Sequence, residues 1–353
     1  MDQNMSTSDA GSDSSADNDL SSDSSSDQGD TFADGGSVKC NVNRGVWMYR
    51  HPVQPDPLGT DVLIDDTVND TTDELAVIAN LNANSIFRVY GNYGKRPSTD
   101  AANIAAWNSL LDNAGIQSQV LIGDAKDIFP SAPDTAAVLC RNTLFEDIQA
   151  RFIDFNNAHP LASEQFKGIH LDIEPQQYNT PSTSCGYKMM NYLPWSDLTP
   201  PQKTQRYMLL LQTLIDARHY LDTHGQGSAK IFIDLAPWVD SIPSMSFVWP
   251  ATYQTLTATD GLDWLVQAAG IVDGITFMTY SRATAAQIHT SVTNEVSLAT
   301  EVRVSVNAKE RLPYASGTPL WMMDLTDMWS TVNDYEMTFC EGMDLFNYKY
   351  IEE

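Results

Sequence analysis

Three ionisable side chains alternate with aliphatic ones in the segment FKGIHLDIEP. Successive side chains of a β-strand point to opposite faces, so the pattern predicts an apolar face and a second face bearing His170, Asp172 and Glu174. Repulsion between neighbouring carboxylates and partial loss of solvent raise the pKa of one of them. A carboxylic acid that stays protonated near neutral pH can act as a general acid. The alternative is a polar network with a structural role only.

The chain from residue 39 onward alternates β-rich runs with helical stretches. We expect strands at 44–49, 85–91, 117–124, 168–174, 230–238, 274–280, 302–307 and 344–350. Apolar residues recur at helical spacing between them, at 71–81, 100–115, 134–158, 199–225, 260–270, 284–299 and 325–342. This order predicts a single α/β domain at residues 39–353, a (β/α)8 TIM barrel. An open doubly wound sheet is the alternative, although no Gly-rich turn follows the first strand.

The barrel fold would direct the ionisable face of the segment inward. Helix-facing positions of the strands are apolar, so His170, Asp172 and Glu174 are expected to point into the barrel. Chain direction then places Glu174 at the carboxyl end of the strand, where active sites of such barrels lie. A glutamic acid there suits protonation of a glycosidic oxygen.

The motifs KGIHLDIE and DGITFMTY resemble the fourth- and sixth-strand signatures of family 18 glycoside hydrolases, the chitinase-like TIM-barrel enzymes. Those signatures read Asp-Gly-x-Asp-x-Asp-x-Glu and Met-x-Tyr. The resemblance implies that Glu174 is the general acid/base, that Asp172 orients the substrate acetamido group, and that Tyr280, beside Met278, supports that group. In that family the substrate's own N-acetyl oxygen is the nucleophile and the configuration is retained, an exception to the two-carboxylate rule.

The fourth-strand motif is divergent. Lys167 and His170 stand where the family has its first two aspartates, and Ser281 stands where an aspartate often follows the tyrosine. We expect His170 to hydrogen-bond the neighbouring aspartate and hold it in place. The eighth predicted strand offers Phe346 and Tyr348 in place of a tryptophan.

Two other hypotheses, both of which involve sugars, remain as alternatives. A retaining glycosidase with two glutamates, ~5–5.5 Å apart, would use Glu174 and Glu310, although alternation along the seventh strand puts Glu310 on its outer face. The other reading is a catalytically inactive carbohydrate-binding barrel. A metal centre is disfavoured because alternate positions of one strand lie ~6–7 Å apart, and we expect no cofactor.

Aromatic and polar residues near the predicted strand ends could line sugar subsites, because sugars stack their C–H faces on aromatic rings. The expected substrate-binding set is Trp47, Tyr49, Arg88, Tyr90, Asp234, Trp238, Met278, Asn307 and Glu310.

The composition limits the partners. The chain carries 46 acidic against 20 basic residues and a formal net charge of −26, which disfavours binding to nucleic acid or anionic lipid. No apolar stretch approaches the ~18–20 residues of a membrane helix. A carbohydrate substrate fits these limits.

Residues 1–38 form a Ser/Asp-rich segment without lysine or arginine. Such a composition predicts a disordered tail, which would serve as a linker that tethers the barrel to the cell surface. The barrel topology makes the disulfides Cys40–Cys340 and Cys140–Cys185 one of three connectivities, and four free cysteines are the alternative. If both bonds form, the protein is extracellular.

Overall fold

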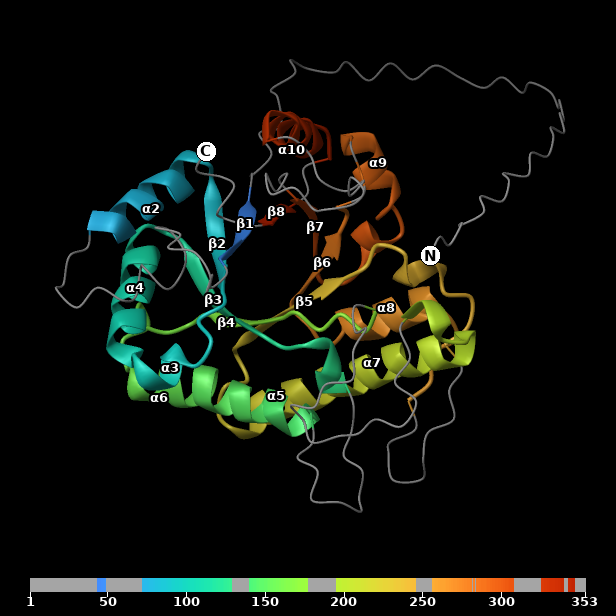
Figure 1. Cartoon of the computed structure of the whole chain (residues 1–353), viewed down its shortest axis with the longest axis horizontal. Helices are drawn as coiled ribbons and strands as arrows, with labels where there is room; N and C mark the ends of the chain where they lie inside the picture. Colours follow the sequence, from blue (N-terminus) through green and yellow to red (C-terminus); the bar gives the residue numbers. More distant parts are fainter. Residues whose placement is uncertain are drawn as a thin grey trace, which may run out of the picture. The chain divides into compact units, whose positions relative to one another are not determined.

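The computed structural model describes residues 43–48, 72–128, 140–176, 195–245, 256–280, 282, 284–307, 325–339 and 342–346. Eight parallel strands form a closed barrel in the order β1 to β8 (Figure 1). They are β1 (Arg44–Met48), β2 (Ile86–Gly91), β3 (Gln117–Ile122), β4 (Gly168–Leu171), β5 (Lys230–Leu235), β6 (Gly274–Met278), β7 (Glu301–Asn307) and β8 (Gly342–Phe346). Pairing of β1 with β8 closes the ring, so the predicted (β/α)8 barrel is confirmed and an open sheet is excluded.

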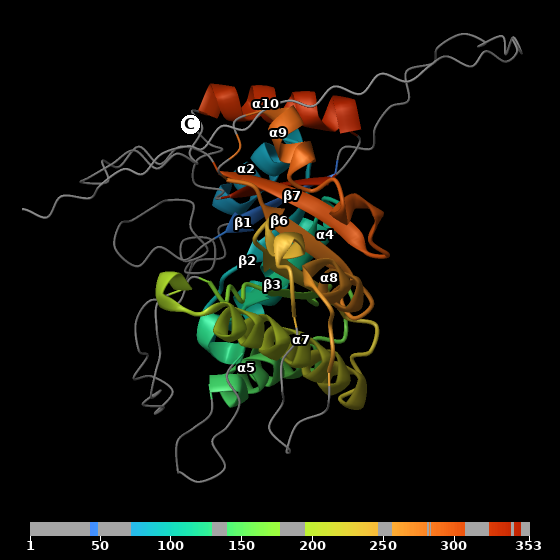
Figure 2. The ribbon, with the colours of Figure 1, turned by 90° about the vertical axis from the view of Figure 1, so that its right-hand side faces the viewer.

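Helices surround the strands. They are α2 (Thr72–Ala83), α3 (Arg96–Thr99), α4 (Ala101–Asn113), α5 (Cys140–Ile148), α6 (Asp154–Ala158), α7 (Pro200–Thr223), α8 (Gly261–Ala269), α9 (Ala285–Thr290) and α10 (Leu325–Phe339). A π-helical turn, η2 (Gln149–Ile153), joins α5 to α6, and the 3₁₀ helices are η1 (Ala125–Ile128), η3 (Trp195–Asp197), η4 (Val239–Ser241) and η5 (Glu295–Ser297). Figure 2 shows α5 and α7 on one side of the strands and α10 on the other.

The core lies between the strands and the helices. Ile169, Leu171 and Ile173 are buried in it, as the alternation predicted. Aliphatic residues from all the remaining strands are buried in the same core. A helix that crosses a membrane would need a longer apolar run than any helix offers in the described ranges.

Polar residues fill the middle of the barrel. Arg303 donates two hydrogen bonds to Asp344 Oδ1, at 2.8 Å from Nε and 2.6 Å from Nη2. Tyr90 and Thr276 donate hydroxyl hydrogen bonds to the same carboxylate. Burial opposes ionisation of Asp344, but Arg303 and Thr276 hold its pKa below the usual value. Gly45 leaves room here, because a Cβ on it would lie 2.7 Å from the Tyr90 hydroxyl.

Some predictions fall outside the described residues. These are the disordered tail at residues 1–38 and the side chains of Cys40, Cys140, Cys185 and Cys340.

Candidate active site

The segment after β4 carries the two predicted carboxylates. The backbone N–H of Asp172 donates to Ile122 O at 3.0 Å, which continues the pairing with β3 one residue beyond the strand. Gly123 has φ +119° and packs against this segment, since a Cβ there would lie 2.8 Å from Ile173 Cγ1. The close approach fixes the backbone from Asp172 to Glu174 at the carboxyl end of the barrel.

Glu174 is buried, with 9% of its surface exposed. Its Oε2 accepts a hydrogen bond from Gln176 Nε2 at 2.9 Å. Tyr207 of α7 donates its hydroxyl to Gln176 Oε1 at 3.4 Å, and Arg206 donates to Pro175 O at 2.9 Å. Helix α7 therefore holds the segment that bears the candidate acid. Sequence reasoning missed these three supporting residues, because nothing in the α7 pattern shows that its side chains reach the end of β4.

Tyr280 follows β6 and lies near several carboxylates. Burial raises the pKa of its phenol well above the usual value, and the charges of Asp234, Glu174 and Asp172 raise it further, while a hydrogen bond with Ser305 opposes the shift. The structure thus brings together three of the residues predicted as catalytic, Glu174, Asp172 and Tyr280.

His170 is paired with a residue of the next strand. Its Nε2 lies 2.8 Å from Asp234 Oδ2, and both side chains are buried. Burial lowers the pKa of His170 to about 4. Burial, and then the charge of Asp344, raises the pKa of Asp234 well above its usual value, although a Trp47 hydrogen bond opposes this. Burial therefore disfavours the charged form of both partners, which the 2.8 Å hydrogen bond joins.

This pairing differs from the expected contact between His170 and Asp172. Those two residues lie two positions apart on one strand, which separates them by ~6–7 Å. Asp234 on β5 comes closer, and Asp172 acts on His170 through its charge.

Two of the expected subsite aromatics lie inside the barrel. Trp47 and Tyr90 are buried, and their ring centroids are 5.6 Å and 4.1 Å from that of His170. They pack around this histidine and are closed to a sugar ring in solution. Trp238 differs, because 37% of its surface is exposed and its ring lies 5.5 Å from that of Trp195.

The other expected subsite residues are dispersed. Arg88 lies at the amino-terminal end of the barrel, where it bonds Glu301. Met278 ends β6 and is partly buried, and Asn307 ends β7. Tyr49 and Glu310 lie outside the described residues.

Metal ligation finds no support in the part of the chain that the structure describes. No group of three or more histidine, cysteine, aspartate or glutamate side chains there is arranged to hold an ion.

No protein-family model matches the chain, and no curated protein matches it. Solved structures do match at low identity. A protein described as an α-L-fucosidase from Bacteroides thetaiotaomicron VPI-5482 is 8% identical, with a TM-score of 0.47 over 86% of each chain. The D-psicose 3-epimerase of Clostridium cellulolyticum H10 is 10% identical (TM-score 0.39, 88% of this chain and 89% of that one). A chitinase from Chromobacterium violaceum ATCC 12472 is 12% identical (TM-score 0.36, 76% and 68%). At such identities the likeness concerns the fold alone.

Proposed function

We propose that this protein is a glycoside hydrolase in which Glu174 is the general acid/base and the substrate's acetamido group is the nucleophile. The observation that carries the proposal is the buried Glu174 carboxylate just past the end of β4, which accepts a hydrogen bond from Gln176. The charges of Glu174 and Asp172 also raise the pKa of the Tyr280 phenol, after the larger effect of its burial. Active sites of (β/α)8 enzymes lie at the carboxyl end of the barrel. The two motifs that resemble family 18 supply the same three residues.

In the proposed reaction, Glu174 gives its proton to the glycosidic oxygen while the bond to the anomeric carbon breaks. The acetamido carbonyl oxygen attacks that carbon and forms a cyclic oxazolinium ion. Asp172 accepts the acetamido N–H hydrogen bond, and Tyr280 donates its hydroxyl to the acetamido oxygen. Water then attacks the anomeric carbon and gives a proton to the Glu174 carboxylate, while the bond from that carbon to the acetamido oxygen breaks and the acetamido group is restored. Two successive inversions at the anomeric carbon retain the configuration.

The buried His170–Asp234 pair supports this arrangement. Burial disfavours both the imidazolium and the carboxylate of the pair. Its 2.8 Å hydrogen bond ties β4 to β5 next to the segment that carries Asp172. We assign it a positioning role.

The test compares wild type with Glu174→Gln on acetylated and plain β-glycans. Loss of the proton donor should lower kcat/KM by about 10² to 10⁴, while calorimetric binding of chitin oligosaccharides is kept. Tyr280→Phe serves as a companion variant, and its kcat/KM should fall less than that of Glu174→Gln. Equal hydrolysis by wild type and Glu174→Gln would refute the proposal.

Two further outcomes separate the alternatives. Saccharide binding without turnover by wild type would support an inactive carbohydrate-binding barrel. Turnover restricted to non-acetylated sugars would support the two-glutamate mechanism with Glu174 and Glu310.

A further inference from the structure

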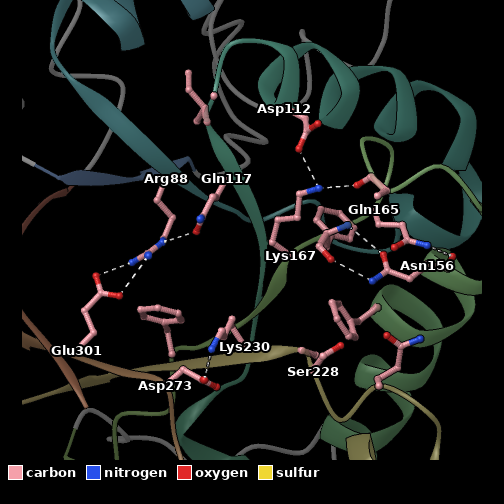
Figure 3. Close-up of a pocket in the computed structure, with 18 residues that line it drawn as sticks. Arg88, Asp112, Gln117, Asn156, Gln165, Lys167, Ser228, Lys230, Asp273 and Glu301 are labelled. Atoms are coloured by element: carbon pink, nitrogen blue, oxygen red, sulfur yellow. Dashed lines mark hydrogen bonds and ion pairs between the residues drawn. The ribbon is translucent and has the colours of Figure 1, made fainter. Parts of the chain in front are cut away.

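A pocket opens at the amino-terminal end of the barrel (Figure 3). Its volume of about 590 Å³ lies in the range of small-molecule sites. Gln117, Lys230 and Glu301, which line it, are the first residues of β3, β5 and β7. Glu174 follows the last residue of β4, so this pocket and the candidate active site lie at opposite ends of the strands.

Three ion pairs line the pocket. Lys230 Nζ lies 2.7 Å from Asp273 Oδ1, and Lys167 Nζ lies 2.9 Å from Asp112 Oδ1. The third pair joins Arg88 to Glu301 at 3.1 Å. Figure 3 shows the pairs at separate places around the pocket. The lining thus holds three cations and three anions, in a chain whose net charge is −26. This balance favours a neutral ligand over an ion.

The pairs are partly open to solvent. The Lys230 side chain is 57% exposed and that of Asp112 is 39% exposed. Ion pairs with this exposure contribute only about 0–1 kcal/mol to stability, so stability alone gives little reason to gather them here. Their ammonium and carboxylate groups remain within reach of a small molecule.

One wall of the pocket is rigid. The Arg88 guanidinium lies 4.2 Å from the Phe232 ring centroid. It donates to Gln117 Oε1 at 3.3 Å and to both oxygens of Glu301. Phe232 and Phe166 are each 2% exposed, so the polar groups above them form the surface that a ligand would meet. Polar groups held in place in this way lower the ordering cost of binding.

We infer that this pocket binds a neutral mono- or disaccharide. A hydroxyl group both donates and accepts hydrogen bonds. Two neighbouring hydroxyls of a sugar ring can therefore accept from Lys230 and donate to Asp273, and a second such pair can engage Lys167 and Asp112. The inference does not depend on hydrolysis at Glu174.

The experiment titrates the full-length protein with glucose, N-acetylglucosamine, cellobiose and N,N′-diacetylchitobiose by calorimetry. Glu174→Gln is the parent, so that no sugar is hydrolysed. Lys230→Met removes the ammonium and keeps most of the aliphatic stem. Lys95→Met is the matched control, because this lysine is exposed and does not line the pocket. Asp112→Asn tests the second ion pair.

One saccharide should bind the parent and the Lys95→Met control alike. Its affinity should fall about tenfold or more in Lys230→Met and in Asp112→Asn, since each loses a charged hydrogen-bonding group. Binding at Glu174 would persist as a separate isotherm in every variant. Equal affinities in all four proteins overturn the inference, as does the lack of any saccharide binding at millimolar concentration. A response to inorganic phosphate alone would also overturn it.

Discussion

Gln176 links the candidate acid to the helix layer. It donates to Glu174 Oε2 and accepts from the Tyr207 hydroxyl. A donor to a carboxylate stabilises its charged form. Gln176 should therefore set the pH at which Glu174 gives up its proton.

Gln176→Glu tests this role. A second carboxylate beside Glu174 disfavours loss of the Glu174 proton, so the alkaline limb of the kcat/KM profile should move to higher pH. The measurement is the pH–rate profile on a hydrolysed glycan.

Tyr207→Phe provides the control, because it keeps the ring and removes only the 3.4 Å hydrogen bond to Gln176. It should change kcat/KM by less than about tenfold. An alkaline limb that stays in place in Gln176→Glu would contradict the positioning role of Gln176.

The sequence predicts which side chains lie at the candidate active site better than it predicts the residues that they contact. Alternation around Glu174 and Asp172 is visible in one short segment, and their placement follows from strand geometry. The partner of His170 comes from β5, and α7 reaches Glu174 through Gln176. Contacts between such distant segments leave no local pattern. Burial of Trp47 and Tyr90 was missed for the same reason, since ring size alone does not show which rings fill the barrel.

At the scale of elements, β4 and the helix after β6 end earlier than predicted. β4 stops at Leu171, although Asp172 still bonds to β3. The helix predicted at 284–299 ends at Thr290. The hydroxyls of Thr290 and Thr293 bond to backbone carbonyls four residues earlier, and such side-chain contacts compete with regular helix. Helix propensity alone therefore predicts the wrong C-terminal boundary for this threonine-rich helix.

η5, which follows this helix, carries a buried carboxyl group. Glu295 is 1% exposed, and the backbone N–H groups of Glu295 and Asn294 offset only part of the burial of its carboxylate. Burial, and then the charge of Asp240, raises the pKa of Glu295 to about 7. The folded state therefore binds a proton more tightly than the unfolded chain. Stability from this group is complete below the unfolded pKa of about 4.5 and is lost as the pH rises through about 7.

The variant Glu295→Gln should not show this loss of stability at high pH, because its side chain does not ionise. The variant should be more stable than wild type at pH 8 by up to about 2–3 kcal/mol and nearly equal to it at pH 4. Urea unfolding at both pH values measures the difference. A Glu295→Gln difference that is the same at both pH values would refute the buried-charge explanation.

At the scale of the whole molecule, one ion network occupies the barrel interior. The Arg303–Asp344 pair is 1% and 0% exposed. Breaking a buried pair leaves an uncompensated charge and costs about 3–5 kcal/mol. Arg303→Met should therefore lower the free energy of unfolding by this amount near pH 7, measured by urea unfolding.

The loss should shrink as the pH falls, because Asp344 without Arg303 is a buried carboxyl that takes up a proton at a higher pH than in wild type. The double variant Arg303→Met/Asp344→Asn is the control and should be more stable than Arg303→Met alone at pH 7. A double variant no more stable than the single one would show that the cost is one of packing.

The barrel itself was predictable because eight β-rich runs separated by helical runs admit few arrangements. The interior network was not. Arg303 and Asp344 come from different strands, and the stagger between strands that brings them together cannot be seen in either strand's own alternation. Lys230 and Lys167 likewise meet acidic partners on neighbouring segments, Asp273 and Asp112, and neither pairing is visible in the local sequence pattern.

The filled interior also governs how the two ends of the molecule can influence one another. Arg303, Asp344, Tyr90 and His170 are fully or almost fully shielded from solvent and stand between the Lys230 pocket and Glu174. A small molecule bound at one end of the barrel therefore cannot diffuse through the interior to the other end. Any coupling between the two ends would have to act through these buried side chains. Each end can therefore be redesigned separately while those side chains stay in place.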